Sequence, residues 1–160
     1  MRQGKLFKSV RAAISFDENL MFNSVLTDKG LQEWILNLNK EQLFAGENSL
    51  GVKLERIGGG YSLTTEVLNV GKSFSFGGKS KTKKQGGSPF LLDSGDYYDS
   101  YNLKLGNGFF VIDSDPQKEE NNLEDKYGIF LEGLQDKNLQ KLIDVIRGQF
   151  IKEVRLQLVA

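Results

Sequence analysis

The chain has 160 residues, of which 39% are apolar and 26% charged, a composition typical of one folded domain. It contains neither cysteine nor histidine, which excludes disulfides, ordinary zinc sites and nucleophilic sites of the Cys-His or Ser-His-Asp kind. The net charge is zero, but residues 1–84 hold 13 Lys/Arg and 8 Asp/Glu (net +5), whereas residues 85–160 hold 8 and 13 (net −5). Two halves of opposite charge can pair within the fold or between copies.

Residues 1–26 form a candidate N-terminal arm. Within it, spacing favours a short basic helix at 4–15, whose charges either face solvent or face phosphate groups. A longer helix is expected to begin at Thr27 as its N-cap, with Asp28 in the first turn, and to end by Gly46. Its apolar residues recur near a period of 3.6, and Trp34 is expected in the core.

Residues 46–61 are expected to form a loop, and residues 62–70 a strand because of their β-branched content. Residues 71–87 contain five glycines and five lysines without any acidic residue. We expect a long, mobile basic loop, or a hairpin extension, that contacts DNA or protein. The candidate contact residues are Lys72, Phe74, Phe76, Lys79, Lys81, Lys83 and Lys84.

The chain is organised around residues 88–101, SPFLLDSGDYYDSY. Here an apolar anchor at Phe90 is followed by a turn in which Gly95 can take a positive φ. An amphipathic turn or short helix at 96–101 then gathers Tyr97, Tyr98 and Tyr101, whose burial would each contribute roughly 1.5–3 kcal/mol.

Two strands, 102–105 and 109–113, are expected to pair through the turn Gly106-Asn107-Gly108. An acidic loop at 115–125 should lead into a helical turn at 123–126, after which residues 129–131 re-enter the core. A last helix capped by Asp136 should carry one apolar stripe, and residues 154–159 alternate as in a short strand or swapped tail. The stripe comprises Leu139, Leu142, Ile143, Ile146, Phe150 and Ile151.

Asp93, Asp96 and Asp99 recur every three residues and could bind a hard cation in a metal-assisted hydrolase. The same residues also serve as turn, cap and solvent-facing residues, which is the interpretation we prefer. The sequence therefore predicts no catalytic residue, no metal site and no cofactor. Since no apolar run approaches the ~18 residues of a membrane span, we also expect no membrane contact.

Several segments resemble, in their order along the chain, the tail-completion and head–tail connector (neck) proteins of tailed bacteriophages, especially those infecting Bacteroidetes, including crAss-like phages. The resembling segments are LQEWILNLNKEQLF at 31–44, GGYS at 59–62, FLLDSGDYYDSYNLKLG at 90–106, GFFVIDSDPQKEENNLEDKYG at 108–128 and LEGLQDKNLQKLIDVIR at 131–147. The motif residues are Leu92, Asp93, Ser94, Gly95, Tyr98, Ser100, Tyr127 and Gly128.

The resemblance covers roughly residues 27–150 and implies a non-enzymatic α+β protein. It implies a small antiparallel sheet packed against the first long helix and the last one. Several copies would form a ring at the neck or upper tail of the virion, assembled in the host cytoplasm, joining head to tail around the DNA path. The partners implied are further copies, adjacent neck, portal or tail proteins, and packaged DNA. A small nucleic-acid-binding module that uses the Phe/Lys loop remains the alternative.

Overall fold

The structure, a computed structural model, describes residues 17–118 and 121–159. The basic helix predicted at 4–15 lies outside these residues. The elements, in chain order, are α2 (Glu18–Leu26), α3 (Lys29–Phe44), a 3-10 turn η1 (Leu54–Arg56), α4 (Leu63–Leu68), β1 (Phe74–Phe76), β2 (Lys79–Lys81), α5 (Asp96–Asp99), β3 (Asn102–Leu105), β4 (Phe110–Asp113), β5 (Gln117–Lys118), β6 (Asn121–Asn122), α6 (Leu123–Tyr127) and α7 (Asp136–Val159).

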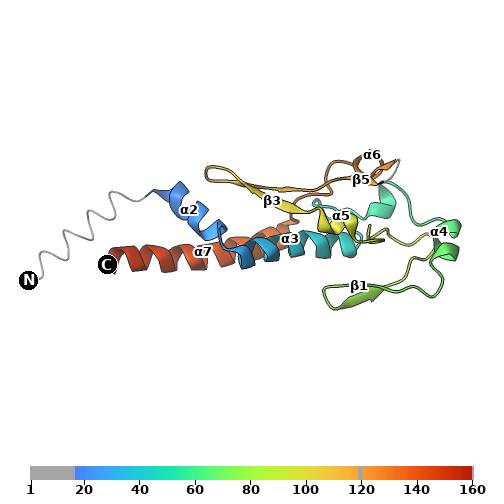
Figure 1. Cartoon of the computed structure of the whole chain (residues 1–160), viewed down its shortest axis with the longest axis horizontal. Helices are drawn as coiled ribbons and strands as arrows, with labels where there is room; N and C mark the ends of the chain where they lie inside the picture. Colours follow the sequence, from blue (N-terminus) through green and yellow to red (C-terminus); the bar gives the residue numbers. More distant parts are fainter. Residues whose placement is uncertain (1–16, 119–120, 160) are drawn as a thin grey trace, which may run out of the picture.

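The described chain is elongated, with α7 along its length (Figure 1). Helix α2 packs against α7 and α3, and β3 also contacts α3. Helix α4 lies at the opposite end of the molecule from the C-terminal part of α7 (Figure 1). The α+β class predicted from the sequence is confirmed. The strands form three separate two-stranded antiparallel sheets, β1–β2, β3–β4 and β5–β6, where a single small sheet was expected.

Helix α3 forms where the apolar period predicted it, but its cap is one residue later. Asp28 is the N-cap, and its side chain accepts the N–H of Leu31, whereas Thr27 is the C-cap of α2. The C-cap of α2 and the N-cap of α3 are therefore consecutive residues, and Asp rather than Thr supplies the N-cap oxygen. Ile35 and Leu43 are fully buried, and the Trp34 ring is only partly buried against the core edge.

The strand predicted at 62–70 is wrong, because these residues form the helix α4. Ser62 caps it by accepting the N–H of Thr65 at 3.1 Å, and Asn69 closes its C-terminal end. β-Branched residues have only a weak preference against helix, which a favourable cap outweighs in so short a segment.

The basic segment 71–87 adopts the hairpin alternative. Phe74 pairs with Lys81 and Phe76 with Lys79, and the turn uses Gly77 and Gly78, both with positive φ. The alternation in Phe-Ser-Phe turns both rings to one face of the hairpin, toward the core, and leaves Ser75 exposed.

The hairpin β3–β4 was predicted correctly, with Leu103 opposite Ile112 and Leu105 opposite Phe110. The turn is closed by the Gly106 N–H, which donates to the Phe109 carbonyl at 2.8 Å. The predicted helical turn at 123–126 is also confirmed as α6. The two-residue strands β5 and β6 were not predicted, because each pairs only with the other.

The chain after α6 differs from prediction at two places. Leu131 re-enters the core with no exposed area, but Ile129 and Phe130 remain 69% and 46% exposed. Residues 154–159 continue α7 as helix, without the predicted short strand. Asp136 is the first residue of α7, and the Gln135 carbonyl accepts the first helical hydrogen bonds.

The stripe predicted on α7 is covered along only part of its length. Leu142 is 1% exposed and lies in the core, and Ile146 packs against the core edge. Leu139, Ile143 and Ile151 are about two-fifths exposed, at 42%, 39% and 42%. Helix α7 therefore carries more apolar surface than α2 and α3 cover in the described residues.

Candidate functional site

The turn Asp93-Ser94-Gly95 orients the residues that follow it. Gly95 has φ +107°, a left-handed value that a side-chain-bearing residue rarely adopts. Ser94 Oγ donates to Asp96 Oδ2 at 2.7 Å, and the Asp99 N–H donates to the Gly95 carbonyl at 2.9 Å. This arrangement starts α5 and points its tyrosines inward, as the sequence predicted.

The three tyrosines of this stretch are buried and hydrogen-bonded. Tyr98 Oη donates to the Phe90 carbonyl at 2.6 Å, and the hydroxyls of Tyr97 and Tyr101 lie 2.9 Å apart. Tyr97 Oη also donates to Glu132 Oε1 at 3.4 Å. Burial raises the pKa of each of these tyrosines far above its ordinary value. At neutral pH all three hydroxyls are thus neutral, and Tyr97 links this stretch to Glu132, in the segment before α7.

Asp93 forms ion pairs with two lysines. Its carboxylate oxygens lie 2.8 Å from Lys118 Nζ and 2.7 Å from Lys83 Nζ. Hydrogen bonds from Lys118 and then Lys83 hold the pKa of Asp93 at about 2, below its ordinary value. Lys83 is only 7% exposed, and its ammonium group lies 4.4 Å from the centre of the Phe74 ring. The structure therefore brings the basic segment and the DSG turn together, which the sequence did not indicate.

A cleft of about 490 Å³ opens beside this ion pair, between α4, the 83–93 segment and α6. Its lining mixes apolar and basic side chains, including Leu68, Leu91, Tyr127, Lys118 and Lys126. A cleft of this size could accommodate a side chain or short peptide segment. Tyr61 lines it as well, and burial raises the pKa of this tyrosine to about 12 while its hydroxyl oxygen accepts the Phe90 N–H at 3.0 Å.

The candidate residues of the basic segment divide into two groups. Phe74 and Phe76 pack against Phe90, Phe44 and Tyr98 with ring centres 5.3–6.1 Å apart. Lys81 also turns inward, 5.6 Å from the Phe44 ring centre, and desolvation lowers its pKa. Lys83 is held by Asp93, as described above. The candidates that remain exposed are Lys72, Lys79 and Lys84.

The Tyr127-Gly128 motif fastens α6 onto the loop after η1. Tyr127 is 5% exposed, and a Cβ placed on Gly58 would lie 2.6 Å from its ring, so only glycine fits there. Gly128 takes φ +81° and ends α6, its N–H donating to the Glu124 carbonyl at 2.7 Å. Leu92 is partly buried against the core, and Ser100 Oγ accepts the Asp115 N–H at 3.0 Å. Among the motif residues, Tyr127 and Asp93 line the cleft itself.

A buried polar network that the sequence did not predict joins α3 to the segment before α7. Asn39 is fully buried; its Nδ2 donates to the Leu131 carbonyl at 3.1 Å, and its Oδ1 accepts the Gly133 N–H at 2.8 Å. One turn later, Gln42 Oε1 accepts the Gln135 N–H at 2.8 Å. Polar residues on the inner face of a helix are the one signal that could have revealed this network.

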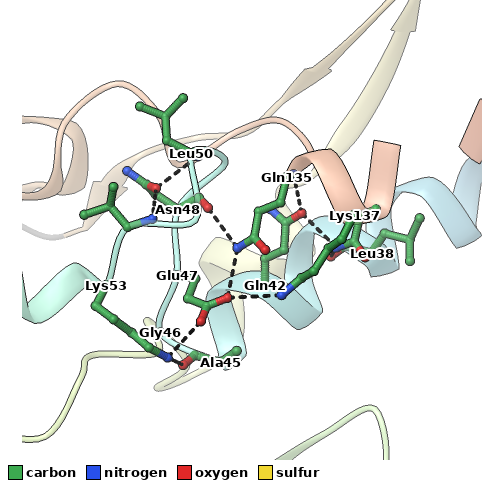
Figure 2. A network of polar contacts seen from close by, with 12 residues as sticks. Leu38, Gln42, Ala45, Gly46, Glu47, Asn48, Leu50, Lys53, Gln135 and Lys137 are labelled. Carbon is green, nitrogen blue, oxygen red and sulfur yellow. Dashed lines mark hydrogen bonds and ion pairs between the residues drawn. The ribbon is translucent and has the colours of Figure 1, made fainter. Parts of the chain in front are cut away.

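Gln135 continues the network toward the loop after α3, as Figure 2 shows. Its Nε2 donates to Glu47 Oε2 at 3.0 Å and to the Asn48 carbonyl at 3.1 Å. Burial acts to raise the pKa of Glu47, but hydrogen bonds from Gln135 and Lys53 and the charges of Lys53 and Lys137 outweigh it and lower this pKa to about 2. The network is a structural clamp rather than a reactive site, since each of these contacts ties one chain segment to another.

The three aspartates considered for metal binding do not form a site. Asp93 is engaged by two lysines, Asp96 accepts from Ser94, and Asp99 lies on the exposed side of α5. Across residues 17–118 and 121–159, no group of three or more His, Cys, Asp or Glu side chains could hold a metal ion.

Comparisons with known proteins identify no relative of this chain: no family model, no curated protein and no solved structure matches it. In the part of the chain that the structure describes, no helix is both long enough and apolar enough to cross a bilayer.

Proposed function

We propose that the chain is a structural virion protein, a tail-completion or head–tail connector subunit that forms a ring at the neck or upper tail of a tailed bacteriophage. The observation that carries the proposal is the order of the sequence segments that resemble such proteins, from 31–44 to 131–147. The subunit acts by binding its neighbours, and no catalytic step belongs to its role.

The elongated shape and the exposed apolar surfaces of the molecule are compatible with this role. The molecule is elongated, with α4 and the hairpin β1–β2 at one end and α7 extending toward the other (Figure 1). Large apolar side chains are exposed on α4 and on the 129–130 loop. Exposed apolar surface of this kind supports an assembly role, because a soluble monomer gains nothing from leaving it uncovered.

A genetic experiment tests the proposal. In a phage that encodes this chain, its gene is interrupted by a nonsense codon, and lysates from suppressing and non-suppressing hosts are compared by electron microscopy. We expect the non-suppressing host to yield DNA-filled heads and tails that are not joined, and expression of the chain from a plasmid to restore complete virions. Complete, infectious particles made without the chain would refute the role.

Contact with packaged DNA is the second candidate function, and it now depends on lysines alone. The Phe74 and Phe76 rings are engaged in the core and are not free to stack on bases. Lys72, Lys79 and Lys84 are exposed and could contact phosphates without reading sequence. Replacing all three by alanine should lower the slope of log K against log[salt] by about 2–3, since each phosphate contact contributes about 0.7–0.9. The absence of measurable binding by the unsubstituted chain at low salt would remove this candidate.

A further inference from the structure

Helix α4 is oriented with its apolar side outward. Its polar residues Thr65 and Glu66 are partly buried, and Glu66 Oε2 accepts the Gln85 N–H at 2.9 Å. No α4 residue is buried. The apolar side chains of the helix and its C-terminal extension, here called the α4 surface, are Leu63, Val67, Leu68 and Val70, with 57%, 61%, 69% and 76% of their area exposed. An amphipathic helix normally buries its apolar side, so this orientation indicates a surface that another molecule covers.

The surroundings of the α4 surface are basic. Residues 53–87 contain seven Lys/Arg and two Asp/Glu. The exposed Lys72 follows Val70 by two residues, and the exposed Lys84 adjoins Gln85, whose N–H Glu66 accepts; neither lysine forms an ion pair within residues 17–118 and 121–159. A complementary surface must therefore be apolar and carry negative charge.

The chain itself carries such a surface, here called the 130 surface, which comprises Leu50, Ile129 and Phe130. Their exposed fractions are 63%, 69% and 46%. The N–H and Oγ of Ser49 both donate to the Phe130 carbonyl, at 2.9 and 3.0 Å, and so hold the two loops together. Residues 88–135 contain three Lys/Arg and ten Asp/Glu, so this segment has an acidic excess, and the exposed Asp125 and Lys126 both lie close in sequence to Ile129.

We propose that the α4 surface of one copy packs on the 130 surface of a second copy. This inference rests on the proposed ring-forming function and names the contact between neighbouring subunits. In this contact each copy gives its α4 surface to one neighbour and its 130 surface to another, so the contact is head to tail and each end of the assembly keeps one free surface for the next copy. Such a contact generates a closed ring when its rotation closes, whereas a symmetric contact would stop at a dimer.

The test uses the full chain and two double variants with matched chemistry. Val67→Asp with Leu68→Asp alters the α4 surface, and Ile129→Asp with Phe130→Asp alters the 130 surface. Leu156→Asp, at a side chain 57% exposed on α7, is the control for placing a charge on an exposed apolar residue. Sedimentation velocity from 1 to 500 µM measures assembly, and circular dichroism with urea unfolding checks that each variant is folded.

We expect the unsubstituted chain and the control to form species larger than a dimer as concentration rises. Each double variant should remain monomeric, with self-association weakened about 30-fold or more, a loss typical of central interface residues. A mixture of the two double variants should give a 1:1 dimer and nothing larger, because each variant retains the surface that the other lacks. The 1:1 dimer shows that the two surfaces bind each other, and growth of the unsubstituted chain beyond a dimer distinguishes the head-to-tail contact from a reciprocal pair.

Three results would overturn the inference. One is an unsubstituted chain that stays monomeric at all concentrations. This includes a monomer that binds vesicles containing phosphatidylserine through its α4 surface. Another is self-association that survives either double variant, and the third is a mixture that fails to form the dimer. These outcomes leave the proposed function to the nonsense-codon experiment. Conversely, complete virions made without the chain would refute that function while leaving a measured head-to-tail contact intact.

Discussion

Replacing Asn39 by alanine should remove the most deeply buried polar link between α3 and the segment before α7. The Asn39 side chain has no exposed area and makes two hydrogen bonds, to the Leu131 carbonyl and from the Gly133 N–H. Alanine can make neither bond. Because Leu131 is also fully buried, water cannot replace the lost partner without opening the packing around it.

The magnitude follows from these two bonds. A hydrogen bond makes a net contribution of about 0.5–1.5 kcal/mol to stability. Removing one so that its buried partner is left unsatisfied costs about 1–3 kcal/mol. Asn39→Ala should therefore lower the free energy of unfolding by about 2–4 kcal/mol, a large part of the roughly 5–15 kcal/mol typical of a domain.

Urea unfolding followed by tryptophan fluorescence measures this change, since Trp34 is the only tryptophan and lies on α3. Asn37→Ala is the matched control, because Asn37 is exposed on the same helix and alanine favours helix there. The control should change stability by less than about 0.5 kcal/mol. A loss of less than about 0.5 kcal/mol for Asn39→Ala would show that the network does not hold the two segments together.

Three further predictions concern the DSG turn and the helices. Tyr98→Phe should cost about 1–2 kcal/mol in urea unfolding, because the buried Phe90 carbonyl loses its donor; an unchanged midpoint would contradict the hydrogen bond. Gly95→Ala should destabilise the fold by about 1–2 kcal/mol because the φ of Gly95 is +107°. Gly148→Ala, in open space on α7, should instead stabilise the fold by up to about 1 kcal/mol. Shifts in melting temperature of the same sign for the two variants would contradict this contrast. The lowered pKa of Asp93, about 2, stabilises the folded state above pH ~4, and this contribution should disappear as pH falls toward 2. Asp93→Asn should therefore flatten the dependence of stability on pH between 4 and 2.5, and an unchanged slope would mean that the ion pairs contribute nothing.

Local signals accounted for the parts of the fold that the sequence predicted well. These parts are helix α3, the turn between β3 and β4, and the left-handed turn at Gly95. Each is determined by residues only a few positions apart. Such signals remain valid in the folded chain because neighbouring residues determine them.

The errors arose where distant partners decide the outcome. The Phe74 and Phe76 rings were expected to contact DNA or protein from a mobile loop, but they pack against Phe90, Phe44 and Tyr98, from other parts of the chain. Lys83 was assigned to the same basic surface, but Asp93 and two rings hold it inside the protein. No spacing within residues 71–87 could have revealed these partners.

The candidate site, like the fold, was predicted only where local sequence signals determine it. The sequence identified the DSG turn and the basic segment separately, and the structure joins them through the ion pairs of Asp93. The outward apolar side of α4 could not be predicted while residues 62–70 were expected to form a strand. In this orientation Glu66 accepts the N–H of Gln85, nineteen residues away, a contact that no local pattern indicates.

The central claim, that this chain is a subunit of the virion neck or upper tail, is tested most directly by locating it in purified particles. Antibodies raised against the purified chain, carried on gold and imaged by electron microscopy, should bind at the head–tail junction, and mass spectrometry should find several copies per particle. Particles that contain no detectable chain, or gold confined to the capsid or fibres, would contradict the claim.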